Sequence, residues 1–203
     1  MIVLDKLFKP LDYIRIEHQE KRWFDFGLPV ILAAMCAVCL YFLPKPVAYI
    51  GKDGVISLVN GILQILSGFY IASMAAVATF QKDGMDDQME GEPPTLKVIK
   101  RGEKVSKNLT RREFLTYLFG YLAFMSILMY FVGGFIQLAS GNISMFITNM
   151  SSEFKHVLVG LYMLIVFNIL STTVLGMHFM IDKIHRPKPK VIDRKKSNAE
   201  ASE

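Results

Sequence analysis

Residues 59–72 read VNGILQILSGFYIA, a stretch without a charged side chain. It belongs to an uncharged run that extends from residue 54 to 81, and similar runs cover residues 26–44, 114–152 and 156–181. A helix needs about 20 apolar residues to cross the hydrocarbon core of a bilayer, so each run is long enough to hold a span. Every Asp, Glu, Lys and Arg of the chain lies outside these four runs. This segregation predicts an all-α integral membrane protein with four transmembrane helices.

The runs and the charged segments between them define the expected organisation of the chain. Spans are expected at about residues 27–43, 55–80, 114–138 and 156–181, which together with a loop at 82–113 make a transmembrane domain of residues 27–181. Residues 1–26 mix apolar and charged side chains at helical spacing, with a break at Pro10. They are expected either to lie in the membrane interface or to pack on protein as a cytoplasmic segment. Residues 182–203 read as a basic cytoplasmic tail.

Lysine and arginine are distributed unevenly between the connecting segments. The two ends of the chain and the loop at 82–113 hold 20 of them, and the other two loops hold 3. Because short loops rich in Lys and Arg stay in the cytoplasm, both termini and the 82–113 loop are predicted to be cytoplasmic. No cleavable signal peptide is evident before the first span, so that span is expected to remain in the mature protein.

The second span carries polar side chains where lipid would be expected. Asn60, Gln64 and Ser67 fall on one helical face, and small residues repeat every four positions beside them. An amide that faces lipid lacks hydrogen-bond partners, whereas small residues let two helices approach closely. A seam for helix packing or oligomerisation is therefore predicted, and the fourth span holds a weaker copy of the pattern. The predicted seam residues are Asn60, Gln64, Ser67, Gly68, Ala72, Ala76, Asn168, Thr172 and Gly176.

The third span is rich in aromatic side chains, which suggests a lipid-facing or peripheral position. A different use of the polar stripe, as the lining of a conduction path, stays open. Carriers and pores usually place an ionisable residue or a broken helix at the middle of the membrane, and neither is evident in the four runs.

The 82–113 loop is acidic in its first part and basic in its second. Thr110 followed by Glu113 fits a capping box, which would begin the third helix just before the membrane. The basic side chains are suited to anionic lipid or to a protein partner, and direct binding of nucleic acid is not expected. The predicted contact residues are Asp83, Asp86, Asp87, Lys97, Lys100, Arg101, Arg111, Arg112 and, in the tail, Arg186.

No set of residues in the sequence predicts catalysis, a metal site or a cofactor. Cys36 and Cys39 lie within an apolar span, where burial disfavours the reactive thiolate. The four histidines are not spaced as metal ligands, and neither a phosphate-binding loop nor a nucleophile–base pair is recognisable. The chain is therefore not expected to be an enzyme, and no cofactor, metal or catalytic residue is assigned.

The chain resembles the KwaA family, the membrane subunits of the bacterial two-component Kiwa anti-phage defence system. The resemblance covers the overall size, the four-span layout with cytoplasmic ends, and the opening MIVLDKLFKPLDYIRIEHQEKRWFDFGLP, residues 1–29. It implies a multi-pass protein of the bacterial inner (cytoplasmic) membrane that forms a homo-oligomer, with a tetramer as one candidate size. It also implies a sensor or anchor that binds a cytoplasmic, DNA-binding effector, KwaB. No site motif is matched, so no site residue is transferred.

Two other functions remain as alternatives. One is a small oligomeric channel or pore-forming protein that depolarises the membrane, in which the polar stripe would face water. The other is a housekeeping assembly protein or a superinfection-exclusion protein, which would share most of these features of the sequence.

Overall fold

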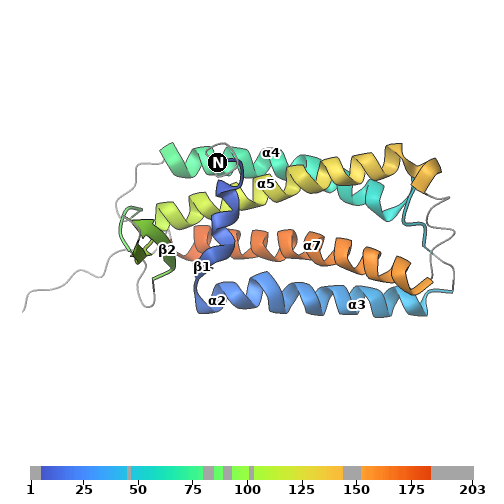
Figure 1. The fold of residues 1–203 in the computed structure, drawn as a ribbon, viewed down its shortest axis with the longest axis horizontal. Coiled ribbons are helices and arrows are strands. Elements are labelled where there is room, and N and C mark those ends of the chain that lie inside the picture. Colours follow the sequence, from blue (N-terminus) through green and yellow to red (C-terminus); the bar gives the residue numbers. More distant parts are fainter. Residues whose placement is uncertain are drawn as a thin grey trace, which may run out of the picture.

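The computed structural model describes residues 6–44, 47–79, 85–88, 93–100, 103–143 and 152–183. The molecule is mostly helical, and its four long helices are α3 (Leu28–Phe42), α4 (Val55–Thr79), α5 (Arg111–Leu138) and α7 (Ser152–His178) (Figure 1). The short helix α2 (Gln19–Arg22) and a π-helical turn, η2 (Trp23–Gly27), lead into α3 without a break. A second π-helical turn, η3 (Phe179–Lys183), extends α7.

Among the described residues, four stretches of helix are long and apolar enough to cross a membrane. They are Trp23–Phe42, Val55–Thr79, Arg111–Leu138 and Val157–Ile181. The prediction of four apolar helices of membrane-spanning length is therefore confirmed. The first one begins before the expected residue 27, because the π-helical turn continues the helix through Asp25 into α2.

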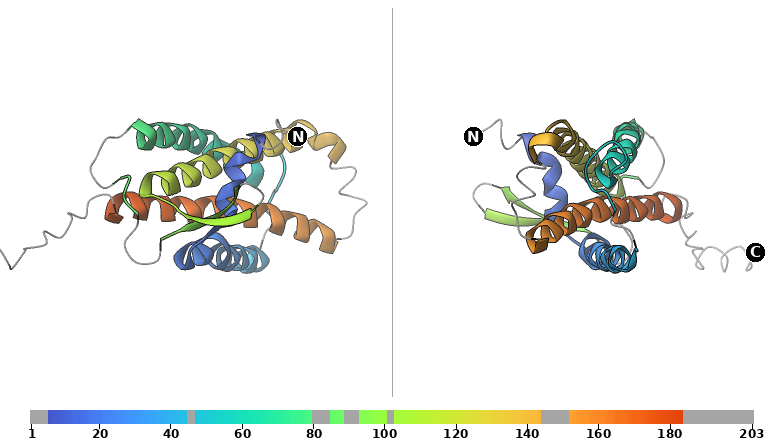
Figure 2. Two further views of the ribbon diagram at one scale, coloured as in Figure 1. Left: turned by 60° about the vertical axis from the view of Figure 1, so that its left-hand side comes forward. Right: turned by 90° about the vertical axis from the view of Figure 1, so that its right-hand side faces the viewer.

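The long helices pack as two pairs. Helix α4 lies along α5, α3 lies along α7, and contacts between α5 and α7 join the pairs into one bundle (Figure 2). The β-strands lie at the end of the bundle where α5 begins, which we call the sheet end. The connection from α3 to α4 and the C-terminal end of α5 lie at the opposite end, which we call the far end.

Helix α5 is the most buried of the four, and this overturns the expectation that the aromatic span is peripheral. Phe114, Leu118 and Leu122 are fully buried, because α4, α7 and the N-terminal segment all pack around the first half of α5. In the second half of α5, the aromatic side chains of Phe131 and Phe135 are exposed. The aromatic side chains therefore fill the core near the sheet end and face outward near the far end.

A three-stranded antiparallel sheet corrects the all-α expectation. Its strands are β1 (Ile16–Glu17), β2 (Thr95–Lys100) and β3 (Glu103–Asn108), in the order β1-β2-β3. Strands β2 and β3 form a hairpin from Thr95 opposite Asn108 to Lys100 opposite Glu103, within the segment that was expected to be a loop. Leu96 is buried while its neighbour Lys97 is exposed, which is the alternation of a sheet with one covered face.

The start of α5 agrees with the sequence. The Thr110 hydroxyl accepts a hydrogen bond from the Glu113 amide at 3.2 Å, and a Glu113 carboxylate oxygen accepts one from the Thr110 amide at 3.2 Å. This reciprocal arrangement confirms the predicted capping box, which satisfies two backbone donors at the helix N-terminus.

The N-terminal segment crosses the bundle as a strap. Residues 8–17, here called the strap, contain the 3-10 helix η1 (Lys9–Arg15) and strand β1. Pro10 lies in the first turn of η1, where a missing backbone donor is tolerated. The strap packs on α5: the rings of Tyr13 and Tyr121 stack with centroids 4.9 Å apart, and Phe8 meets Phe124 edge-on at 6.4 Å.

Candidate functional site

A buried ion pair lies within the bundle near the sheet end. Lys21 Nζ is 2.6 Å from Asp25 Oδ2, and the two side chains are only 2% and 5% exposed. Asp25 belongs to the π-helical turn that opens the first apolar helix. π-helical turns are rare and are frequent at functional sites, and charged side chains among membrane-spanning helices are costly. Their combination makes this pair the first candidate site.

Side chains from two other segments complete the environment of the ion pair. The Tyr13 hydroxyl of the strap donates to Asp25 Oδ1 at 3.1 Å, and the Thr172 hydroxyl of α7 donates to the same oxygen at 3.2 Å. Lys21 Nζ also lies 4.4 Å from the centre of the Tyr13 ring, a cation–π contact. Burial, followed by the neighbouring negative charge of Asp25, raises the pKa of Tyr13 well above its usual value, so the phenol stays a donor.

Helix α7 also binds the backbone of the π-helical turn. Asn168 Nδ2 donates to the carbonyl oxygen of Asp25 at 2.7 Å, and the Ser171 hydroxyl donates to that of Phe24 at 2.7 Å. The Tyr121 hydroxyl of α5 donates to Asn168 Oδ1 at 2.7 Å. These contacts satisfy carbonyl groups that the wider π turn leaves open to other donors.

We call this set the buried polar cluster, and it joins four segments of the chain. Its members come from the strap, the first apolar helix, α5 and α7: Tyr13, Lys21, Asp25, Tyr121, Asn168, Ser171 and Thr172. The ion pair has no net charge and its polar atoms are bonded. The cluster therefore holds the four segments together, and we call this role a lock. Strand β1 directly follows η1, so the strap connects the buried polar cluster to the sheet.

The predicted seam residues of α7 pack within the subunit. Asn168 and Thr172 belong to the buried polar cluster. Gly176 faces α5, where an added Cβ atom would lie 2.8 Å from Leu118 Cδ2. The polar and small residues of this helix therefore take part in helix packing within the chain, and a seam between copies stays a prediction.

The predicted stripe on α4 divides into two parts. Asn60 is buried and donates through Nδ2 to the carbonyl oxygen of Tyr130 at 3.3 Å, and Ser67 is half-buried and donates to the carbonyl oxygen of Gln64 at 2.9 Å. The remaining members are exposed on the surface of the subunit: Gln64, Gly68, Ala72 and Ala76. The stripe turns outward because a repeat of four residues drifts around a helix of 3.6 residues per turn.

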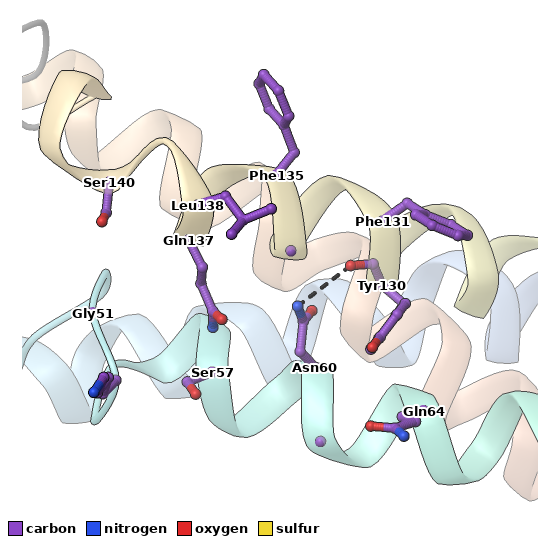
Figure 3. A pocket seen from close by; sticks show the side chains of 13 residues that line it. Gly51, Ser57, Asn60, Gln64, Tyr130, Phe131, Phe135, Gln137, Leu138 and Ser140 are labelled. Atoms are coloured by element: carbon purple, nitrogen blue, oxygen red, sulfur yellow. Dashed lines mark hydrogen bonds between the residues drawn. The ribbon is translucent and has the colours of Figure 1, made fainter.

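A cleft of about 950 Å³ opens at the far end, between the start of α4 and the end of α5 (Figure 3). Asn60 rises into it from α4 and Gln137 descends into it from α5. Both carry a buried atom without a hydrogen-bond partner among the described residues, Oδ1 of Asn60 and Nε2 of Gln137. The lining residues are Gly51, Lys52, Ser57, Asn60, Gly61, Gln64, Tyr130, Phe131, Gly134, Phe135, Gln137, Leu138 and Ser140.

At the sheet end, several predicted contact residues bind each other. Arg112 donates to both carboxylate oxygens of Asp86, at 2.7 and 3.2 Å, and to the carbonyl oxygen of Val77 at 2.9 Å. The bond from Arg112 lowers the pKa of Asp86. Lys97 pairs with Glu17 at 2.7 Å, with both side chains largely exposed. The backbone oxygen of Asp87 accepts from the Arg111 amide.

The other predicted contact residues are only partly described. Lys100 lies in β2, but its side chain is outside the described part of the structure. Asp83, Arg101 and Arg186 lie outside the described residues altogether. Within the described ranges, no group of three or more His, Cys, Asp and Glu side chains is arranged to hold a metal ion.

The central members of the buried polar cluster were missed from the sequence. Lys21 and Asp25 belong to the charged N-terminal segment, residues 1–26, whose charged side chains were all expected to face water. Nothing in the composition of the segment indicated that these two are buried. Their spacing could have indicated an ion pair, because residues four apart on a helix are neighbours. The two residues also lie directly ahead of the uncharged run that begins at residue 26. Gln137 was missed because a single amide near the end of a span is common at an interface.

Comparison of the chain with models of protein families, with curated proteins and with solved structures yields no match.

Proposed function

We propose that this chain is the sensor and anchor subunit of an anti-phage defence complex in the bacterial inner membrane. It would oligomerise in the membrane and hold a cytoplasmic, DNA-binding effector of the KwaB type. The observation that carries the sensor role is the continuous connection from the helices to the sheet through the strap and the buried polar cluster. The defence role rests on the resemblance of the chain to the KwaA family.

The connection provides a physical route for a signal. Tyr13 is anchored in the core against Asp25 and Tyr121, and only two residues separate it from Ile16, which pairs with Leu96 of the hairpin. A shift of the first apolar helix against α7 would have to break or move the buried ion pair. The strap would carry that movement to β1 and so to the hairpin, without any chemical step.

The hairpin offers a surface for the effector. Strand β3 forms the edge of the sheet, and no further strand pairs with it in the described parts of the chain. Its Val105 and Lys107 are exposed, as is Lys97 of β2. An edge strand with free backbone groups and basic side chains suits a partner that adds a strand or presents acidic residues.

The exposed small residues of α4 suit contact with another copy. Gly68, Ala72 and Ala76 carry little side-chain bulk, and neither a Cβ atom added at Gly61 nor one added at Gly68 would meet any atom within 4 Å. In lipid, such a face allows the close backbone approach that favours association of helices.

Capture of the effector tests this proposal. The tagged chain would be co-expressed with its effector in bacteria, solubilised in mild detergent and purified, with the co-purified effector quantified. Lys97 and the exposed Ser106 of β3 are cross-strand partners and lie on one face of the hairpin. A Lys97→Glu/Ser106→Glu variant is expected to lose most of the effector while it still inserts in the membrane and to lose protection against phage in plaque assays. Lys52→Glu at the far end makes a matched control that keeps the effector. Full capture by the double variant would refute the docking surface.

A channel is the second candidate, favoured by the exposed amide of Gln64 beside small residues. If several copies gather through α4, Gln64 would lie near the axis of the assembly. Steady current through the purified protein in planar bilayers, abolished by Gln64→Leu without loss of the oligomer, would favour this function over the sensor. The sensor proposal predicts no current and a smaller oligomer for Gln64→Leu.

A further inference from the structure

The far-end cleft lies at the depth of lipid headgroups. Asn60 is five residues into α4, about 7–8 Å along its axis, and Gln137 is the last residue but one of α5. Helix α5, at about 42 Å, is longer than a hydrocarbon core of about 30 Å, so its ends extend into the headgroup regions. The cleft therefore opens where phosphate and glycerol groups of one leaflet are found.

Two polar atoms in the wall of the cleft lack partners among the residues that the structure describes. Asn60 is only 7% exposed, and its Oδ1 is a buried acceptor that receives no hydrogen bond from them. Gln137 Nε2 is a buried donor that finds no acceptor in the same part of the chain. Buried polar groups in native proteins are almost always bonded, so this wall is complementary to a ligand that offers both a donor and an acceptor.

The charged and polar side chains that line the cleft indicate which type of ligand it can bind. Lys52 is the one charged side chain among the described residues that line it, and no carboxylate lines it. Ser57 and Ser140 add hydroxyl groups. The cleft is thus suited to a group with a net negative charge, and a phosphodiester would accept hydrogen bonds from Gln137 and attract Lys52.

An apolar surface continues from the cleft along the outside of α5. Phe131 and Phe135 are 69% and 70% exposed and Leu138 is also exposed, and all three line the cleft. In a membrane these side chains face acyl chains, so a lipid whose headgroup occupies the cleft can keep its own chains against them.

We propose that the far-end cleft binds one anionic glycerophospholipid, with phosphatidylglycerol as the matching headgroup. A hydroxyl of its terminal glycerol donates to Asn60 Oδ1. Its phosphodiester accepts from Gln137 Nε2 and lies near Lys52, and its acyl chains run along the exposed aromatic side of α5. Bound lipid would fill the gap between α4 and α5 and so stabilise their far-end packing.

Native mass spectrometry of the purified full-length chain tests this proposal. The protein in detergent would be mixed with equal amounts of phosphatidylglycerol, phosphatidylethanolamine and phosphatidylcholine, and the bound lipid counted. Phosphatidylglycerol is expected to exceed phosphatidylcholine about tenfold. Phosphatidylcholine keeps the phosphodiester but lacks both a headgroup donor for Asn60 Oδ1 and the net negative charge that attracts Lys52. Phosphatidylethanolamine is expected to fall between them, because it keeps a donor but has no net charge.

Two variants assign the contacts. Lys52→Ala, at an exposed position, is expected to reduce phosphatidylglycerol to the level of phosphatidylethanolamine. Gln137→Glu replaces the donor by an acceptor of the same size, so it should repel the phosphodiester and weaken binding of phosphatidylglycerol about tenfold or more. Lys97→Ala removes the same charge as Lys52→Ala at the sheet end and should leave the lipid profile unchanged.

Several results would overturn the proposal. Equal retention of the three lipids by the natural chain would mean that water or detergent fills the cleft. Displacement of bound lipid by soluble glycerol phosphate at similar concentration would identify a free phosphate compound as the ligand. Unchanged binding in both Lys52→Ala and Gln137→Glu would place the lipid elsewhere, and a change of oligomer size in Gln137→Glu without lipid loss would assign the cleft to another copy.

Discussion

The two polar regions of the bundle differ in how well their hydrogen bonds are satisfied. At the sheet end, Lys21 and Asp25 are buried and bind each other. Side chains of the strap and α7 also bind Asp25, and Asn168 of α7 is bonded to α5 in turn. At the far end, Asn60 and Gln137 each keep a buried atom that has no hydrogen-bond partner in the described part of the chain. A buried network whose hydrogen bonds are all formed within the chain favours one arrangement of the chain. A buried network with unpaired donors or acceptors is suited to a ligand that supplies the missing partners. We therefore interpret the first region as a lock and the second as a binding site.

The largest effect is expected from breaking the lock. Asp25→Leu leaves the Lys21 ammonium group buried without its carboxylate, which should lower the free energy of unfolding by about 3–5 kcal/mol. Unfolding by SDS in mixed micelles measures this, followed by the fluorescence of Trp23, the single tryptophan of the chain. Asp12→Leu, which breaks exposed ion pairs on the strap, is the control and should cost under about 1 kcal/mol.

The double variant Lys21→Met/Asp25→Leu sharpens this prediction. Replacing both charges by apolar groups removes the unpaired ion, so part of the lost stability should return. The Tyr13 and Thr172 hydroxyls still lose their acceptor, and that part of the loss should remain. If Asp25→Leu is no worse than Asp12→Leu, the ion pair is not buried as described.

A smaller effect is expected from crowding the far end. A Cβ atom at Gly133 would overlap the amide of Asn60, so Gly133→Ala should destabilise the packing of α4 on α5 by about 1–3 kcal/mol. Gly61→Ala, where a Cβ atom meets nothing within 4 Å, is the matched control and should be near neutral. Shortening the opposing side chain with Asn60→Ala should rescue Gly133→Ala, and the absence of rescue would contradict this contact.

Single hydrogen bonds within the bundle should contribute less. Tyr121→Phe removes the hydroxyl that donates to Asn168 and should cost about 0.5–1.5 kcal/mol in the same unfolding assay. Tyr162→Phe is the paired comparison, because the buried Tyr162 hydroxyl has no partner among the described residues and its removal should cost nothing. Equal effects of the two variants would mean that the Tyr121 bond is not formed.

The smallest effect is expected at the surface of the sheet. Lys97 and Glu17 are 61% and 62% exposed, and ion pairs between exposed side chains contribute little. Lys97→Ala should change the free energy of unfolding by less than about 0.5 kcal/mol. A loss above about 1 kcal/mol would show that the sheet needs this pair, and loss of effector capture could then not be assigned to docking alone.

The helical framework could be predicted from the sequence because lipid imposes one strong rule. Charged side chains are costly among lipid tails, so four long uncharged runs were enough to predict four apolar helices. The capping box was equally predictable, since Thr110 and Glu113 carry all the groups that it needs. Both features depend on residues close in sequence.

The hairpin and the buried polar cluster were not predicted from the sequence. Residues 95–98 of the segment TLKVIK alternate polar and apolar side chains ahead of an Arg-Gly pair, which favours a hairpin, but the charged segment 82–113 around them was expected to be a loop. The hydrogen bonds of the cluster join residues up to 147 positions apart, as in the bond from Thr172 to Asp25. The burial of α5 could not be predicted either, because aromatic side chains are equally apolar toward lipid and toward protein.

The central claim of this account is that the ion pair of Lys21 and Asp25 holds the sheet through the strap. Hydrogen–deuterium exchange of the detergent-solubilised chain, read by mass spectrometry at residues 95–100, tests it by comparing Asp25→Asn with the natural chain. The account predicts faster exchange in β2 in the variant, with exchange at the start of α4 unchanged. Identical exchange of β2 in both proteins would contradict the claim, since the sheet would then be held independently of the pair.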